Sequence, residues 1–325
     1  MKSKVLVTGG AGYIGAHLVR FLKEQGHFVR VLDDLSSGDF ARIENYCDEV
    51  IIGSILDIGD LSRATKGIEL VYHLAAYKSV ENSVHKPLGF FMTNVNGTLN
   101  LLKAMAENKV RAIVFASSSA VYGNPYQHSI FREEDIKKPI SPYGITKLIG
   151  ENCLNSICAA EGISSICLRY FNVVGSSYVD ISDNSDFNLF PKIVLSSQLE
   201  SKFEIKGIDY PTLDGTCVRD YVHVADVIEA TCRAGELALQ VNIHLELNIG
   251  SGLGLSVLEI VTEFKKIGNF PFLIENSARR LGDPHTVIAD ISKSSSMLNW
   301  KPQRNLTEII ESVISSSNYK SKIES

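Results

Sequence analysis

The stretch "KVLVTGGAGYIG" (residues 4–15) decides the fold of this 325-residue chain. Its apolar start predicts a buried strand, and the glycines that follow predict a tight turn that opens a helix. Gly9, Gly12 and Gly15 have the spacing G-x-x-G-x-x-G, which lets a pyrophosphate approach backbone N–H groups at a helix N-terminus. Because these glycines lie between a predicted strand and a predicted helix, we interpret them as a dinucleotide-binding turn.

An acidic residue ends the second predicted strand, "FVRVLD" (28–33). A carboxylate at this place accepts hydrogen bonds from a ribose 2′-hydroxyl and repels a 2′-phosphate. Asp33 therefore favours NAD over NADP. A capping turn followed by a surface aspartate is the less favoured interpretation in this context.

Apolar runs and stretches of helical period alternate through the first half of the chain. Two of the predicted helices span 14–25 and 90–108. Further strands are predicted over 49–55, 70–76, 112–119 and 163–175. This alternation is typical of the α/β class and predicts a Rossmann-type doubly wound parallel sheet covered by helices on both faces.

The composition changes after Gly175. Residues 176–188 are polar and rich in Asp and Ser, which predicts a loop, and short helices and strands mixed with Gly and Pro follow. We therefore predict a Rossmann domain over 1–175 and a smaller α+β lobe over 176–325. The apolar run at 244–250 is a predicted strand, and residues of about 219–250 are expected to return to the first domain.

Composition and charge exclude several classes of protein. Hydrophobic residues make up 45% and charged residues 21%, with a net charge of −5 and a pI near 5.9. These values predict a soluble protein that binds neither nucleic acid nor a membrane. The six cysteines show no zinc-like spacing, so we expect free thiols, no metal site and a cytoplasmic location. We find no signal peptide and no apolar run near the roughly 20 residues of a membrane span.

The segment "SPYGITK" (141–147) places Tyr143 and Lys147 one turn apart on a predicted helix. Moving the pKa of a tyrosine from about 10 to about 7 requires roughly 4 kcal/mol. One cation at about 5 Å, in an effective dielectric near 20, supplies roughly 3 kcal/mol. An oxidised nicotinamide ring would complete the shift, so the pair makes chemical sense as a base for a hydroxyl whose carbon gives up hydride.

The Tyr143–Lys147 pair alone is weak evidence for a catalytic role, because composition predicts roughly one Tyr-x-x-x-Lys by chance. Its position in the predicted sheet supports such a role. The pair follows the fifth predicted strand, near the carboxyl ends where such sheets bind ligands. The serine-rich "SSSAVYG" (117–123) offers hydroxyl groups at the end of that strand. A helix-surface Tyr and Lys without a role is the alternative that this context disfavours.

Over about residues 4–312 the chain resembles the extended short-chain dehydrogenase/reductases, and within them the UDP-glucose 4-epimerases. The shared signals are "TGGAGYIG", "NVNGT" (94–98), "SSSAVYG" and the Tyr–Lys pair. The more specific signal is "DYPTLDGTCVRDYVHV" (209–224), supported by "RYFNVVG" (169–175) and "ARRLGD" (278–283). The resemblance implies that the lobe over 176–325 binds a UDP-sugar, that NAD stays bound through each turnover, and that the protein is a homodimer.

The resemblance also implies roles for individual residues. Tyr143 would be the catalytic base, Lys147 would hold the nicotinamide ribose and depress the pKa of Tyr143, and Ser118, four residues before Tyr122, would bond the reacting hydroxyl. The positions that match NAD contacts are Gly9, Gly12, Tyr13, Ile14, Gly15, Asp33, Ile55, Lys78, Asn94, Tyr143, Lys147 and Phe171. The positions that match UDP-sugar contacts are Ser118, Asn172, Asn188, Arg219, Arg280, Asp283 and Val287, with Arg279 as the alternative to Arg280.

Three residues depart from the family pattern. Ser54 replaces an acid that contacts adenine, which predicts weaker binding of NAD. Lys206 stands where an aromatic residue lies beside uracil, although a lysine stem can still cover a ring. Val287 aligns with a sugar-pocket residue that is often a bulky tyrosine. A smaller valine would admit a 2-acetamido group, so interconversion of UDP-N-acetylglucosamine with its 4-epimer is the alternative to the glucose–galactose reaction.

Other activities of the same superfamily are less well supported. A 4,6-dehydratase is expected to place Asp and Glu after the catalytic hydroxyl, but Ser119 and Ala120 follow Ser118. A plain reductase would leave the epimerase signature unexplained. A catalytically silent NAD-binding regulator predicts loss of the tyrosine or the lysine, and both are present.

Overall fold

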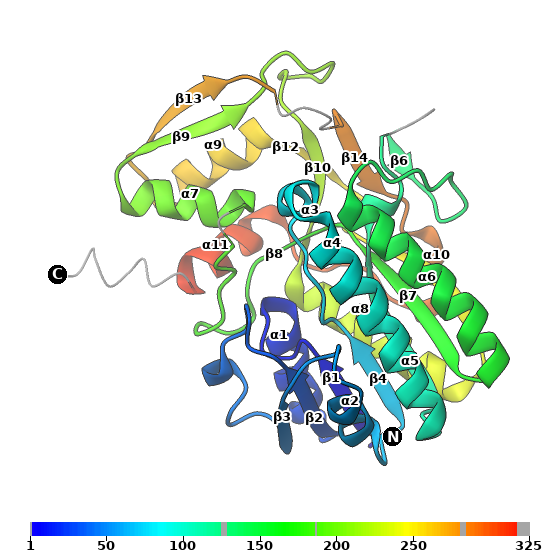
Figure 1. Cartoon of the computed structure of the whole chain (residues 1–325). Coiled ribbons are helices and arrows are strands. Elements are labelled where there is room, and N and C mark those ends of the chain that lie inside the picture. The colour runs from blue at the N-terminus through cyan, green and yellow to red at the C-terminus, as the bar shows by residue number, and fades with distance from the viewer. Residues whose placement is uncertain (1, 125–128, 186, 280–283, 317–325) are drawn as a thin grey trace.

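Seven parallel strands form the central sheet of the computed structural model, which describes residues 2–124, 129–185, 187–279 and 284–316 (Figure 1). Their order is β11-β7-β5-β4-β1-β2-β3. The strands are β1 Lys4–Thr8, β2 Phe28–Asp33, β3 Glu49–Ile52, β4 Leu70–His73, β5 Ala112–Ser118, β7 Ser164–Tyr170 and β11 His244–Ile249. The predicted doubly wound α/β sheet is therefore confirmed, although the strands predicted over 49–55 and 70–76 end at Ile52 and His73.

Helices cover both faces of this sheet (Figure 1). On one face lie α1 (Tyr13–Glu24) and α8 (Val224–Gln240), and on the other lie α2 (Ile58–Thr65), α5 (Gly97–Glu107) and α6 (Pro142–Glu161). Each face has its own apolar core, which explains why the strands are nearly continuous runs of Val, Ile and Leu.

The helix predicted over 90–108 is interrupted at its start. The short helices α3 (Val80–His85) and α4 (Pro87–Phe90) come first, and a π-helical turn, η2 (Phe91–Asn96), leads into α5. The turn places Asn94 in a buried position, where its side chain bonds the backbone of Tyr77. Periodicity does not distinguish this turn from a regular helix, because only six residues are affected.

The strand predicted over 163–175 is divided between two sheets. It pairs with β5 and β11 up to Tyr170, and the backbone N–H of Phe171 still donates to Ile249 O. The chain then leaves the central sheet as β8 (Asn172–Val174), which pairs with β10 (Val218–His223). The division carries the chain from the central sheet into the second lobe.

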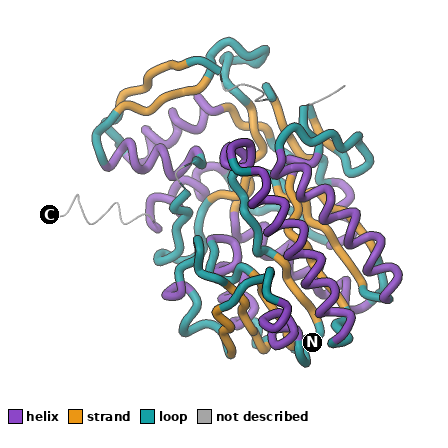
Figure 2. Tube along the Cα trace, viewed as in Figure 1, coloured by secondary structure: helices purple, strands orange, loops and turns teal. Residues whose placement is uncertain are grey.

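The second lobe is built on two small sheets, shown with the other elements in Figure 2. Its larger sheet has the order β12-β10-β14-β6, with β8 beside β10, and its smaller sheet pairs β9 with β13. The remaining elements are η1 Phe40–Arg42, η3 Ser119–Val121, β6 Ile130–Phe131, α7 Leu189–Gln198, β9 Lys202–Lys206, β12 Gly254–Ser256, α9 Val257–Gly268, β13 Leu273–Ser277, β14 Thr286–Ala289, α10 Ser292–Leu298 and α11 Leu306–Ser316. A third apolar core lies among α7, α9 and α11.

The domain boundaries given above remain a prediction, although β11 does lie in the central sheet, next to β7. Within the part of the chain that the structure describes, no helix combines the length and the apolar character that crossing a membrane requires.

Candidate active site

The glycine turn between β1 and α1 tolerates no side chain at two of its positions. Gly9 has φ +72°, and a Cβ atom there would lie 2.7 Å from Ala75 N. A Cβ atom on Gly15 would lie 2.0 Å from Gly9 O. Gly12 is the N-cap of α1, where no side chain caps the helix and no acidic residue occupies the first turn. The first N–H groups of α1 are thus well placed for an anion.

Asp33 is joined to the glycine turn by hydrogen bonds. Its Oδ2 accepts from Ala11 N at 2.9 Å, and its Oδ1 accepts from Leu35 N at 2.8 Å. Burial raises the pKa of Asp33, and these two bonds oppose that rise. Each carboxylate oxygen has a second lone pair, so Asp33 can still accept from a ribose hydroxyl. Together, the turn and this acid fit a dinucleotide.

Tyr143, Lys147 and Ser118 meet at the carboxyl end of β5. Lys147 Nζ donates to Ala116 O at 2.7 Å and lies 5.9 Å from the centre of the Tyr143 ring. Burial lowers the pKa of Lys147 to about 8, while Cys167 and Glu151 act to raise it. Burial also raises the pKa of Tyr143, and its hydrogen bond with Ser118 opposes that rise. The Lys147 ammonium by itself therefore does not lower the pKa of Tyr143 to the neutral range.

The local sequence explains how α6 presents this tyrosine. Ser141 is the N-cap, and its side chain accepts from Gly144 N at 3.1 Å, while Pro142 begins the helix. A Cβ atom on Gly144 would lie 2.5 Å from Ala120 O, and one on Gly150 would lie 2.7 Å from the Phe115 ring. These two glycines thus let α6 pack closely on η3 and on β5.

Several residues predicted to contact the cofactor also hold the site together. Asn94 Oδ1 accepts from Tyr77 N at 2.8 Å, and its Nδ2 donates to Tyr77 O and to Thr146 Oγ1 on α6, both at 3.0 Å. Tyr13 OH donates to Gly175 O at 2.5 Å. Two further positions of this set are Ile14, which is partly buried on α1, and Ile55, which is buried before α2.

Asp183 was not recognised from the sequence, yet it connects two predicted contacts. Its carboxylate lies 3.8 Å from the ammonium of Lys78, a predicted cofactor residue, and accepts from Asn188 Nδ2 at 2.6 Å. Asn188 is a predicted substrate residue. The Asp/Ser-rich composition of 176–188 gave only the general prediction of a loop.

The other predicted substrate residues lie on neighbouring strands of the second lobe. Arg219 on β10 is paired with Val287 on β14, and Arg219 Nη1 donates to Val218 O at 2.8 Å. Asn172 is exposed at the start of β8, and Phe171 is buried beside it. Arg280 and Asp283 lie outside the described residues.

Ser54 and Lys206, which depart from the family pattern, have partners of their own. Ser54 N donates to Asp60 Oδ2 at 3.0 Å, and Ser54 Oγ accepts from Leu56 N at 3.2 Å. Lys206 is partly exposed and forms an ion pair with Glu204 on the same strand.

A buried ion pair behind the site was also missed. Arg169 on β7 and Glu151 on α6 form a two-bonded pair, with their side chains 1% and 3% exposed. Glu151 lies four residues after Lys147, which is the only signal the sequence offered. Its partner is 18 residues further along the chain, on a different element.

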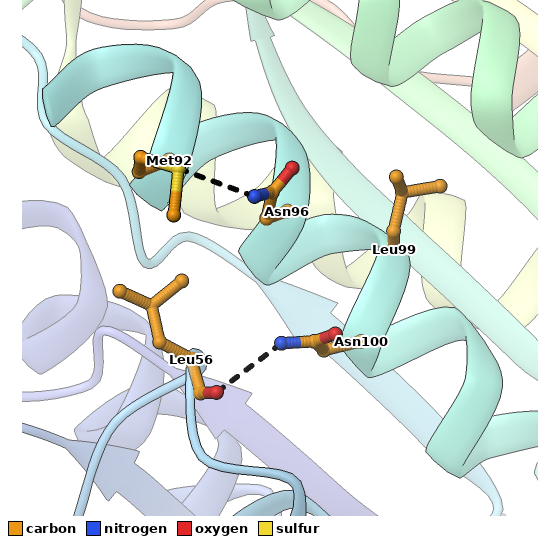
Figure 3. Close-up of a pocket in the computed structure, with 5 residues that line it drawn as sticks. All are labelled: Leu56, Met92, Asn96, Leu99 and Asn100. Carbon is orange, nitrogen blue, oxygen red and sulfur yellow. Dashed lines mark hydrogen bonds between the residues drawn. The ribbon is translucent and has the colours of Figure 1, made fainter. Parts of the chain in front are cut away.

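A surface hollow of about 260 Å³ lies along η2 and α5 (Figure 3). It is lined by Leu56, Met92, Asn96, Leu99 and Asn100. Asn100 Nδ2 donates to Leu56 O at 3.3 Å, which connects α5 to the segment after β3. The lining of this hollow is largely apolar and contains none of the predicted catalytic residues.

Comparisons with known proteins agree with this geometry. The model of the NAD dependent epimerase/dehydratase family matches residues 5–250. The chain is 39% identical to a UDP-glucose 4-epimerase of Lactobacillus helveticus, over 94% of each chain. It is similar in structure to a UDP-glucose-4-epimerase from Stenotrophomonas maltophila with bound NAD and formylated UDP-arabinopyranose, at TM-score 0.93 and 34% identity over 99% of each chain. A UDP-glucose 4-epimerase from Brucella ovis in complex with NAD gives TM-score 0.92 and 34% identity over 98% of each chain.

Proposed function

Because this chain belongs to the NAD dependent epimerase/dehydratase family, we propose that Tyr143, Lys147 and Ser118 perform the chemistry of a UDP-glucose 4-epimerase. The chain is an isomerase that interconverts UDP-glucose and UDP-galactose and uses NAD. One observation carries the assignment of residues. The phenol of Tyr143 is hydrogen-bonded to Ser118 and lies beside a buried ammonium at the carboxyl end of β5.

The three side chains divide the chemistry at the sugar 4-hydroxyl. Tyr143 takes the proton of this hydroxyl, and Ser118 bonds the same oxygen and orients it. The Lys147 ammonium stabilises the phenolate that Tyr143 needs in order to act as a base. NAD would be held by the glycine turn and Asp33 and, when bound, would supply the group that takes the hydride from C4 and gives it back on the opposite face of the sugar.

Inversion at C4 requires that the sugar turn while the nucleotide stays in place. Arg219 is suited to hold the diphosphate, because a guanidinium forms paired hydrogen bonds with phosphate oxygens. Arg280 or Arg279 would supply a second such group, and Asn172 and Asn188 would hold the nucleotide and the sugar. During the turn, Tyr143 keeps the proton that it returns to the product.

Val287 supports a second substrate. It lies beside Arg219 on the neighbouring strand and is only partly buried. Its side chain is short, so we propose that the sugar pocket also admits a 2-acetamido group. UDP-N-acetylglucosamine would then be epimerised by the same residues.

We also propose that the protein is a homodimer, because the helices along one side carry exposed apolar side chains. Leu88 on α4 is 73% exposed, and Val80 and Val84 on α3 and Met92 on η2 are also exposed. Met92 also lines the hollow in Figure 3. A second copy would cover these side chains, and Leu88→Glu is expected to give a monomer in light-scattering measurements of molar mass.

A cytoplasmic location is the remaining part of this proposal. Cys47, Cys153, Cys158, Cys167 and Cys232 are free thiols, and Cys158 and Cys167 are buried. Free thiols fit a reducing compartment. Fluorescence microscopy of the tagged full chain in its host would test this location.

The activity is tested by incubating the purified protein with UDP-glucose and, separately, with UDP-N-acetylglucosamine. Each reaction is run with and without added NAD, and products are separated by anion-exchange chromatography. We expect a new 4-epimer peak without net formation of NADH. Absence of an epimer from both sugars, in a protein that still binds NAD, would overturn the substrate assignment.

A further inference from the structure

Glu151 extends the row of functional side chains on α6 by one turn. It follows Lys147 by four residues and therefore lies on the same face of the helix. Ser117 Oγ donates to Glu151 Oε1 at 2.5 Å. The residues on either side of Ser117 hold the catalytic end of α6, because Ala116 O accepts from Lys147 and Ser118 is bonded to the catalytic phenol. Three successive residues of β5 thus hold three turns of α6.

Arg169 fixes the other side of this carboxylate. It is the neighbour of Ser117 in the pairing of β5 with β7. Its Nε donates to Glu151 Oε1 at 2.9 Å, and its Nη2 donates to Oε2 at 2.8 Å. This two-bonded geometry allows little rotation of the carboxylate, and burial of both side chains keeps water from competing for the bonds.

Arg169 also bonds two residues outside α6 through Nη1. Its Nη1 donates to Tyr122 OH at 2.9 Å and to Glu133 O at 3.0 Å. Tyr122 OH donates to Asn248 Oδ1 at 2.6 Å, and Asn248 N donates to Glu133 Oε1 at 2.8 Å. The guanidinium therefore connects α6 with β7, β11 and the segment after β6. Movement of the helix would break several buried hydrogen bonds.

We propose that Glu151, held by Arg169 and Ser117, is a positioning residue for the proposed epimerase. It keeps Tyr143 and Lys147 in register with Ser118, and its negative charge keeps Lys147 in the ammonium form that the reaction needs. The inference rests on the proposed function for its kinetic measurements only. The alternative is an ion pair that stabilises the fold and has no influence on the chemistry.

The charged groups around Lys147 determine the direction in which its pKa changes when Glu151 is replaced. The titratable and charged groups that surround it are Tyr143 and Glu151 on α6, Cys167 and Arg169 on β7, and His73 on β4. Burial lowers the pKa of His73 to about 3, so His73 is neutral at physiological pH. The Glu151 carboxylate raises the pKa of Lys147, so its removal would lower the pKa of Lys147. A Lys147 that loses its proton no longer stabilises the phenolate, so the pKa of Tyr143 would rise.

Two substitutions separate charge from position. Glu151→Gln keeps the size and an acceptor for Ser117 but removes the charge. We expect it to move the alkaline limb of the pH profile of kcat, where Lys147 loses its proton, by about one unit toward acid and to lower kcat at least about tenfold. Glu151→Asp keeps the charge but shortens the side chain, so we expect a similar loss of kcat with an unmoved profile. Glu246→Gln removes a partly exposed carboxylate on β11 that accepts from Asn155 on α6, and it should change neither quantity.

A second measurement separates failure of this inference from failure of the proposed function. Tyrosinate absorbance, taken as the difference between each protein and its Tyr143→Phe version with NAD bound, follows the titration of Tyr143 without any sugar. We expect Glu151→Gln to move this titration to higher pH, because a neutral Lys147 no longer stabilises the phenolate, even if the wild type does not epimerise UDP-glucose.

Glu151→Gln leaves the Arg169 charge unpartnered, so a variant that restores neutrality is needed in case it does not fold. Glu151→Gln combined with Arg169→Met is expected to return the pH profile to within about 0.3 unit of wild type while kcat stays about tenfold lower. The proposal is wrong if the variants lower only the melting temperature and leave kcat, the pH profile and the Tyr143 titration unchanged.

Discussion

The proposed cofactor side and the proposed sugar side of the site are built in different ways. On the cofactor side, Asp33, Asn94 and Lys147 are buried, and each is hydrogen-bonded to backbone of a neighbouring segment. On the sugar side, Asn188 is exposed and Arg219 is partly exposed. The first group is thus part of the fold as well as the site, whereas the second can change with less effect on folding. Substitutions on the two sides should therefore fail in different ways.

The largest effect is expected from Tyr143→Phe, which removes the proton acceptor and little volume. We expect kcat to fall about 10³-fold, equivalent to about 4 kcal/mol, because general base catalysis is lost. The amount of bound NAD should not change. Tyr46→Phe, which removes an exposed phenol, is the control and should keep full activity. A Tyr143→Phe protein within tenfold of wild-type kcat would show that another group is the base.

Gly15→Ala should damage the cofactor side as a whole. The new Cβ atom would lie 2.0 Å from Gly9 O, so the turn must open. We expect loss of NAD from the purified protein and a loss of about 3 kcal/mol in the free energy of unfolding. Gly89→Ala is the control, since its Cβ atom would meet only the Tyr77 ring, at 3.8 Å. Urea denaturation with quantification of bound NAD measures both effects, and retained NAD would contradict the assigned role of the turn.

Arg219→Met, on the sugar side, should weaken binding of the substrate without loss of NAD. We expect KM for UDP-glucose to rise about 30-fold, or about 2 kcal/mol, because a charge-assisted bond to the diphosphate is lost. Bound NAD should stay at the wild-type level. Arg111→Met removes an exposed arginine that pairs with Glu69, and it should leave KM unchanged. If Arg219→Met instead releases NAD, the two sides are not independent.

The smallest effect is expected from Val287→Tyr. The larger side chain should reduce activity on UDP-N-acetylglucosamine about tenfold, or about 1.4 kcal/mol, while activity on UDP-glucose changes less than about threefold. The ratio of kcat/KM for the two sugars measures this change. An equal loss for both sugars would mean that Val287 does not discriminate at the 2-position.

Local signals made the geometry of the glycine turn, of Asp33 and of the Tyr143–Lys147 pair predictable from sequence. The glycine turn needs positive φ and close backbone approach within a few residues, and Asp33 ends a strand whose apolar run is plain. Tyr143 and Lys147 could be placed together because helical periodicity fixes their relation. These predictions needed no knowledge of distant contacts.

Features that depend on distant partners were not predictable. Strand β8 leaves the central sheet because it pairs with β10. The hydrophobic periodicity of residues 163–175 does not reveal which strand they pair with. The Glu151–Arg169 pair joins two elements whose neighbourhood exists only in the folded chain. Asp183 meets Lys78 across about a hundred residues, so an acidic loop was all that composition could indicate.

The account is tested most directly by the fate of hydrogen at C4 of the sugar. UDP-glucose labelled with deuterium at C4 is incubated with the purified protein, and the UDP-galactose that forms is analysed by mass spectrometry and NMR. Hydride transfer to NAD and back within one active site predicts that C4 of the product retains the deuterium. Loss of the label to solvent would contradict the account, because it would require removal of the C4 hydrogen as a proton.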